Sequence, residues 1–352
     1  MHSLYGRQIF AVDGEVYCWE DVVLFALATG RLDALERAVR QGLQAALQWE
    51  RSGQPLPQDE IDAAAQEFRY DRDLITARET EAWLEARRLA TRDWMAHIRR
   101  QVMRRLPPPA GAPPAPAPDA REVEDTLRID LLCSGEGGPL AQRLAERAAG
   151  AHAARAGGEI PEPPPGTAAP APARLTDKML ADRLPGLPLV RAHERIRLLT
   201  EVDRGFDRFQ VVALTESAID KVVGRRRLEW IRIDCRALGF DSEARAREAA
   251  LCVREDGLSI DTVSADAHVD ARDSRFFLEE MDPELRPVFM AANPVDLVGP
   301  LLYDGSHTLF RILDKVMPSG ADPEVRRRAE ASVLARAVAD EVQRRVRWLG
   351  PT

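Results

Sequence analysis

The sequence has little lysine, few aromatic residues and only four cysteines in its 352 residues. Cys18, Cys133, Cys235 and Cys252 lie far apart and form no Cys-x-x-Cys pair, which argues against a zinc module or a small disulfide scaffold. No run of 18 apolar residues occurs, so no membrane-spanning helix is expected. Because aromatic residues make up only 6% of the chain, the core is expected to consist mainly of Ala, Leu and Val.

The charge balance is acidic, with 57 Asp and Glu against 49 Lys and Arg, a formal net charge of −8. This balance disfavours a general nucleic-acid binder. The glycine-rich stretch 135–138 lacks the Gly-Lys-Ser/Thr ending of a phosphate loop, and no dinucleotide or His-Glu-x-x-His motif occurs. We therefore expect no cofactor and no metal. The first seven residues contain no apolar signal segment, and we expect a cytoplasmic protein without membrane contact.

Two proline-rich stretches divide the chain, with seven prolines in 107–118 and six in 161–172. Proline blocks helix interiors and favours polyproline II, so both stretches are interpreted as linkers or surface loops. The resulting organisation begins with a helical domain that carries an N-terminal hairpin (1–106), a linker (107–120), a helical hairpin (121–156) and a second linker (157–174). A helical segment (175–224), an α/β domain (225–317) and a terminal helix (318–352) follow.

The first segment begins with two short β-prone runs around Asp13-Gly14, a pair that favours a hairpin turn. A helix is predicted over 19–28. A further helix is indicated by an apolar stripe with helical spacing, formed by Leu32, Leu35, Val39, Leu43, Ala46 and Leu47.

The last third mixes strands and helices. Alternating residues predict a strand over 228–234, followed by a helix over 242–255, a loop from 258 and a short strand over 276–278. A short helix over 283–292 precedes two strands that are joined by a turn containing Asp304-Gly305. A long helix over 322–346 ends the pattern. The fold class is therefore predicted to be α+β.

This order of elements resembles the parvulin family of peptidyl-prolyl isomerases. The match is strongest at Leu297-Val298-Gly299-Pro300-Leu301 and at Gly305-Ser306-His307-Thr308-Leu309-Phe310-Arg311-Ile312, which are similar to the last two parvulin strands. The stretch Met281-Asp282-Pro283-Glu284-Leu285-Arg286-Pro287-Val288-Phe289 resembles the helix that forms the floor of the family's proline pocket.

The resemblance implies a site in which His307 is the catalytic polar group and Trp230, Met281, Leu285 and Phe289 contact the substrate. Trp230 stands at about the place of the family's first-strand His, and the family's Gly-Gly loop is absent. The parvulin-like domain over 225–317 is therefore interpreted as degenerate.

The layout as a whole is similar to SurA-type chaperones and to the related proteins of bacterial peptide-maturation systems. It implies that 1–106 is a SurA-like helical module on which the helix over 318–352 packs, leaving an apolar trough open for a peptide or an unfolded polypeptide. A maturation enzyme is a possible further partner. Three functions stay open on the sequence: a chaperone-like protein that holds a ribosomally made peptide, an active peptidyl-prolyl isomerase, and a peptide-modifying enzyme on the same scaffold.

Overall fold

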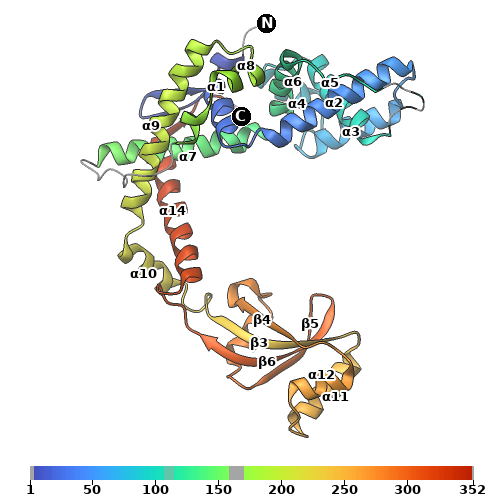
Figure 1. Ribbon diagram of the computed structural model, residues 1–352, viewed down its shortest axis with the longest axis vertical. Helices are drawn as coiled ribbons and strands as arrows, with labels where there is room; N and C mark the ends of the chain where they lie inside the picture. Colours follow the sequence, from blue (N-terminus) through green and yellow to red (C-terminus); the bar gives the residue numbers. More distant parts are fainter. Residues whose placement is uncertain (1–3, 108, 110, 112–113, 158–169, 351–352) are drawn as a thin grey trace. The chain divides into compact units, whose positions relative to one another are not determined.

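The computed structural model describes residues 4–107, 109, 111, 114–157 and 170–350. It divides the chain into two compact units, residues 1–212 with 336–352 and residues 213–335. Both units combine helices with small antiparallel sheets, which confirms the α+β class (Figure 1).

The first unit is mainly helical. Its strands are β1 (Gln8–Val12), β2 (Glu15–Cys18) and β7 (Val346–Trp348). Its helices are η1 (Leu4–Gly6), α1 (Trp19–Ala28), α2 (Asp33–Ser52), α3 (Gln58–Tyr70), α4 (Ala77–Ala86), α5 (Thr91–Arg105), α6 (Ala120–Cys133), α7 (Gly137–Ala156), η2 (Ala171–Arg174), α8 (Asp177–Arg183) and α9 (Leu189–Ala213), together with the end of α14 (Pro323–Arg345).

The three strands of this unit form one antiparallel sheet in the order β2-β1-β7. The predicted hairpin is confirmed: Asp13 and Gly14 both adopt positive φ, as a tight two-residue turn requires. The predicted terminal helix is one residue too long at its end. Val346 leaves the helix and enters β7, because pairing with β1 supplies the backbone hydrogen bonds that further helix would otherwise provide.

A single apolar core runs through the first unit. It contains Ile9 of β1, Leu24 of α1, Leu144 of α7 and Leu199 of α9, all buried. The stretches that the prolines separate in sequence therefore share one core. The second proline-rich linker falls mostly on residues 158–169, which lie outside the described residues.

The second unit is built on a four-stranded antiparallel sheet in the order β4-β3-β6-β5. Its elements are α10 (Glu216–Arg225), β3 (Arg232–Phe240), α11 (Glu243–Arg254), α12 (Ile260–Ala267), β4 (Arg272–Phe277), η3 (Leu278–Glu280), α13 (Arg286–Ala291), β5 (Leu297–Tyr303) and β6 (Ser306–Val316), with the start of α14. The predicted hairpin with Asp304-Gly305 in its turn is confirmed as β5–β6.

Three predictions in this unit are wrong in detail. The strand expected over 276–278 is β4, which begins four residues earlier at Arg272 and ends at Phe277, and Leu278 begins η3. The strand expected over 228–234 begins only at Arg232, since the Trp230 N–H donates to the Arg226 carbonyl in a helical turn that extends α10. The loop expected from 258 contains α12, because the Ser259 hydroxyl accepts a hydrogen bond from the Thr262 N–H and caps a helix there.

The sheet separates two apolar clusters. Ile233, Cys235, Phe310 and Ile312 face α13, whereas Leu238, Phe240 and Leu309 face α11 and α12. Alternation along β3 and β6 produces this division, since successive side chains on a strand point to opposite faces.

Candidate functional site

Helices α2 and α5 of the first unit pack side by side (Figure 1). Residues of both helices line two hollows in the surface of this unit. Val39 of α2 and Ile98 of α5 are buried in the core and hold the two helices in place. Gly42 of α2 lies against the Arg100 side chain of α5, which a Cβ at position 42 would meet at 3.4 Å, an ordinary van der Waals distance. The two helices are in contact at this point.

Two adjoining hollows, each with a cavity volume of about 300 Å³, follow these edges. We call them together the α2–α5 groove. The first hollow is lined mainly by Arg31, Leu32, Leu35, Ala38, His97, Arg100, Gln101, Arg104, Asp130, Ser134, Glu136 and Leu140. The second is lined by Gln41, Gln44, Ala45, Gln48, Trp49, Met103, Arg104 and Leu106. Arg104 lines both hollows.

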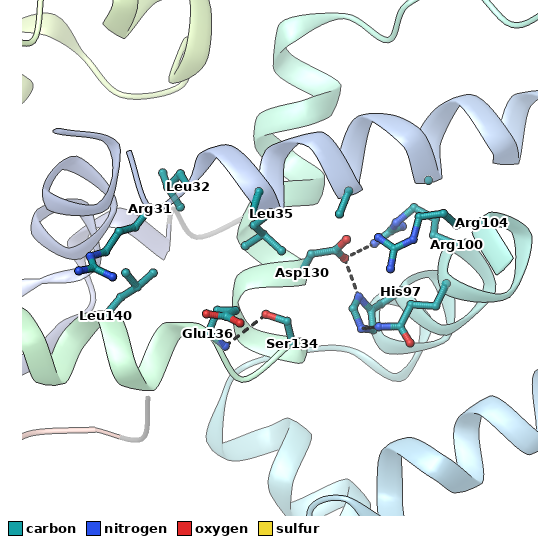
Figure 2. Close-up of a pocket in the computed structure, with 14 residues that line it drawn as sticks. Arg31, Leu32, Leu35, His97, Arg100, Arg104, Asp130, Ser134, Glu136 and Leu140 are labelled. Carbon is teal, nitrogen blue, oxygen red and sulfur yellow. Dashed lines mark hydrogen bonds and ion pairs between the residues drawn. The ribbon is translucent and has the colours of Figure 1, made fainter. Parts of the chain in front are cut away.

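A buried polar network forms one wall of the first hollow. The Asp130 Oδ1 atom lies 2.8 Å from His97 Nδ1 and 2.6 Å from Arg100 Nη2, and Figure 2 shows Asp130 between these two partners. Burial by itself raises the pKa of Asp130, but the contacts with His97 and Arg100 outweigh it and hold this pKa below its usual range. Asp130 is therefore an ionised carboxylate whose charge is balanced inside the wall.

Both ring nitrogens of His97 have a polar partner. Its Nε2 atom lies 2.8 Å from Gln101 Nε2, and its Nδ1 atom lies 2.8 Å from Asp130 Oδ1. His97 is 3% exposed, and both of its nitrogens are engaged. This arrangement suits a group that orients the wall of the groove, and it leaves no nitrogen of His97 free to act as a base.

Thiol chemistry is also disfavoured. Burial raises the pKa of Cys133, at the end of α6, to about 12, and that of Cys235 to about 12. Burial raises the pKa of Cys18 to about 11. All three are protonated thiols at neutral pH, and a thiol in that state is a weak nucleophile.

The second hollow carries a row of amides. Gln41, Gln44 and Gln48 follow one another on α2 at spacings of three and four residues, so they share one edge of the helix. Each amide can donate and accept a hydrogen bond, as a peptide group does. Trp49 and Met103 add apolar surface beside the row. This hollow therefore offers contacts to a polypeptide main chain and to aliphatic side chains.

The residues predicted for a proline pocket are not brought together as one site. Met281 and Phe289 are 3% and 0% exposed and belong, with the partly buried Leu285, to the core cluster beside α13. The Phe289 ring packs against those of Phe276 and Phe310, with ring centroids 5.3 and 5.2 Å away. The protein's own side chains therefore fill this region.

His307 and Trp230 lie elsewhere in the second unit. His307 pairs with Phe240 in the sheet and lies two residues before Leu309 on β6. Phe240 and Leu309 both face α11 and α12, so His307 faces them too. It is therefore on the opposite face from Met281 and Phe289. Trp230 belongs to a third cluster with Phe277 of β4 and residues of α10 and α14.

No group of three or more His, Cys, Asp or Glu side chains converges as metal ligands within the described ranges. No helix among those ranges is both long enough and apolar enough to cross a bilayer.

Comparison with known proteins gives little further guidance. No protein-family model and no curated protein matches the chain. A solved structure is similar at 9% identity, over 97% of this chain and 99% of its own, with a TM-score of 0.19; it comes from work on the virulence factor PEB4 and the periplasmic protein Cj1289, two SurA-like chaperones of the human pathogen Campylobacter jejuni. A TM-score this low carries no argument about fold or function.

The sequence does not predict the α2–α5 groove directly, although the pattern of residues on α2 indicates one edge of it. The apolar stripe on α2 predicts its buried face, and the glutamines at 41, 44 and 48 lie beside that stripe at helical spacing. A row of uncharged amides beside an apolar face is compatible with a binding edge. The partner helix α5 and the contacts of Asp130 come from tertiary packing, which periodicity does not reveal.

Proposed function

We propose that this protein is a chaperone-like, peptide-binding protein that holds an extended segment of another polypeptide in the α2–α5 groove. The observation that carries the proposal is the row of Gln41, Gln44 and Gln48 beside Trp49 and Met103. Amides serve a main chain of any sequence, and methionine adapts its shape to different side chains. Such a lining suits a holder of polypeptides better than a site for one rigid small molecule.

The dimensions of the groove agree with an extended segment. Its lining on α2 runs from Leu32 to Trp49, which at 1.5 Å per residue is about 25 Å. An extended chain rises roughly 3.3 Å per residue, so about seven or eight residues span that length.

The chain itself provides a related contact. The carbonyl oxygen of Pro114, which belongs to the first proline-rich stretch, accepts a hydrogen bond of 3.4 Å from Nη1 of Arg51, near the end of α2. An irregular, proline-rich stretch thus presents a main-chain acceptor to α2. This contact supports the view that α2 meets polypeptide main chain beyond its own core.

The finer parts of the proposal rest on the sequence resemblance. We propose a ribosomally made peptide as the client and a maturation enzyme as a further partner, with the parvulin-like unit as a second contact surface. The cytoplasmic location stays a prediction from the sequence.

The test is a titration that blocks the groove. The probe is a fluorescein-labelled dodecapeptide of Ala, Leu and Gln with acetylated and amidated ends, followed by fluorescence anisotropy with the full chain. Ala45 lines the second hollow, whereas Ala63 of α3 is exposed outside it. Ala45→Trp is expected to weaken binding about tenfold or more, a cost of about 1.4 kcal/mol, and Ala63→Trp is expected to leave it unchanged. Absence of binding to the wild-type chain, or equal effects of both substitutions, would contradict the proposal.

A further inference from the structure

The charges around the first hollow do not cancel. Arg31, Arg100 and Arg104 line it together with Asp130 and Glu136, and Figure 2 shows Arg100 and Arg104 beside Asp130. Asp130 is already paired with Arg100 inside the wall. The remaining lining charges are two guanidinium groups and one carboxylate, which gives a local positive excess in a chain with a net charge of −8.

Arg99 and Arg104 are the two arginines of α5 that form no ion pair among the described residues, and of these two only Arg104 lines the groove. Arg92, Arg100 and Arg105 pair with Asp93, Asp130 and Glu67. Over the ranges that the structure describes, Arg104 has no ion pair, and its side chain lines both hollows. Its charge is therefore available in the middle of the groove.

We infer that the groove selects segments with an acidic side chain, Asp or Glu, at the position that faces Arg104. This inference rests on the proposed function and specifies its substrate class. A guanidinium group presents parallel N–H donors that match the two oxygens of a carboxylate. The flanking side chains, Gln101 and Met103, suit the main chain and the aliphatic neighbours of such a residue.

The network around Asp130 supports this selection. Because Asp130 is held by His97 and Arg100, its negative charge is compensated within the wall and does not oppose an incoming carboxylate. A lysine at the same position of the client would meet Arg104 without a counter-charge, and like charges placed together discriminate against the wrong partner.

The expected size of the effect follows from the exposure of Arg104. Exposed ion pairs contribute about 0.2 to 1 kcal/mol, which corresponds to a preference of up to about fivefold. The preference should weaken as salt is added, because the pair is accessible to screening ions.

The experiment uses three dodecapeptides that differ only at the central residue, which is Glu, Gln or Lys, each labelled with fluorescein and blocked at both ends. Each is titrated against the wild-type chain, Arg104→Glu and Arg99→Glu. Arg99 is an exposed arginine on the same helix that does not line the groove, so its variant matches the charge change.

The wild-type chain is expected to bind the Glu peptide about three- to fivefold more tightly than the Gln peptide, and the Lys peptide most weakly. Arg104→Glu should reverse this order, and Arg99→Glu should keep it. Equal affinities of the wild-type chain for all three peptides would overturn the inference and leave the proposed function standing. A reversal of the order by Arg99→Glu as well would also overturn the inference. If none of the three peptides binds, both the inference and the proposed function are overturned.

Discussion

Phe10 of β1 lies opposite Trp348 of β7, with their ring centroids 5.5 Å apart. The pair joins the two ends of the chain in one sheet. The Leu349 N–H donates to the Ile9 carbonyl beside it, and Arg345 forms an ion pair with Asp13 in the hairpin turn. The last residues of the chain thus complete the first unit, and β1 has a hydrogen-bonded neighbour on both sides.

Trp348→Ala is expected to lower the free energy of unfolding of the first unit by about 1 to 2 kcal/mol, since an aromatic pair contributes beyond the area that it buries. Tyr70→Ala removes an exposed aromatic ring from α3 and serves as the control, with an expected cost within about 0.5 kcal/mol. Urea unfolding followed by circular dichroism measures both. Equal costs for the two variants would show that β7 does not stabilise the unit.

The sequence predicts elements well where a local signal is complete. Asp13-Gly14 and Asp304-Gly305 fix two hairpins because both residues of each pair accept positive φ. Prediction from the sequence fails where the structure of a segment depends on the segment that it pairs with. Residues 346–348 carry no strand pattern of their own, and only pairing with β1 makes them a strand.

The candidate sites were harder to predict for the same reason. Met281 and Phe289 have the spacing of a pocket floor, and the same spacing serves a core, where the structure places them. The groove depends on tertiary contacts, such as those of Gly42 with Arg100 and of Asp130 with His97, and not on a local sequence pattern. These contacts join residues 33 or more positions apart, which no local pattern encodes.

Asp130→Ala is expected to destabilise the first unit by about 3 to 5 kcal/mol, because it leaves His97 and Arg100 without their buried partner. Asp125 is the matched control on the same helix, since it forms an exposed pair with Arg128. Asp125→Ala should cost at most about 1 kcal/mol. Chemical denaturation of both variants decides the point; similar costs would mean that Asp130 has no special role in the wall of the groove.

The interaction between Glu15 and His152 should make stability depend on pH. The hydrogen bond from His152 Nε2, 2.9 Å long, holds the pKa of Glu15 below its ordinary value of 4.5, with Arg155 nearby and Asp13 on the other side of the His152 ring. A carboxyl group whose pKa is lower in the folded than in the unfolded state stabilises the folded protein at pH values above the unfolded-state pKa. This stabilisation is lost as the pH falls through the folded-state pKa.

Glu15→Gln is therefore expected to lower stability at neutral pH, by a few tenths to about 1 kcal/mol because Glu15 is partly exposed. The difference from the wild-type chain should shrink below pH 4.5 and vanish in stronger acid. Thermal unfolding of both proteins between about pH 3 and pH 7 measures this difference in stability. A constant difference over the range would contradict the role assigned to the Glu15 carboxylate.

Proline isomerisation should not be accelerated through His307. Phe289 and Met281 are enclosed in the core, and His307 lies on the other face of the sheet. Exchange NMR on an Ala-Pro peptide, with an active parvulin as positive control, is expected to give the uncatalysed rate for the wild-type chain. Acceleration that His307→Ala abolishes would refute this assignment of faces.

The most direct measurement of the central claim is site-specific photo-crosslinking to the uncharged dodecapeptide. Benzoylphenylalanine in place of Gln48 lies in the groove, and in place of Gln66 it lies on the exposed side of α3. We expect a crosslinked product from position 48, identified by mass spectrometry, and none from position 66. Crosslinking from position 66 alone, or from both positions equally, would contradict binding in the α2–α5 groove.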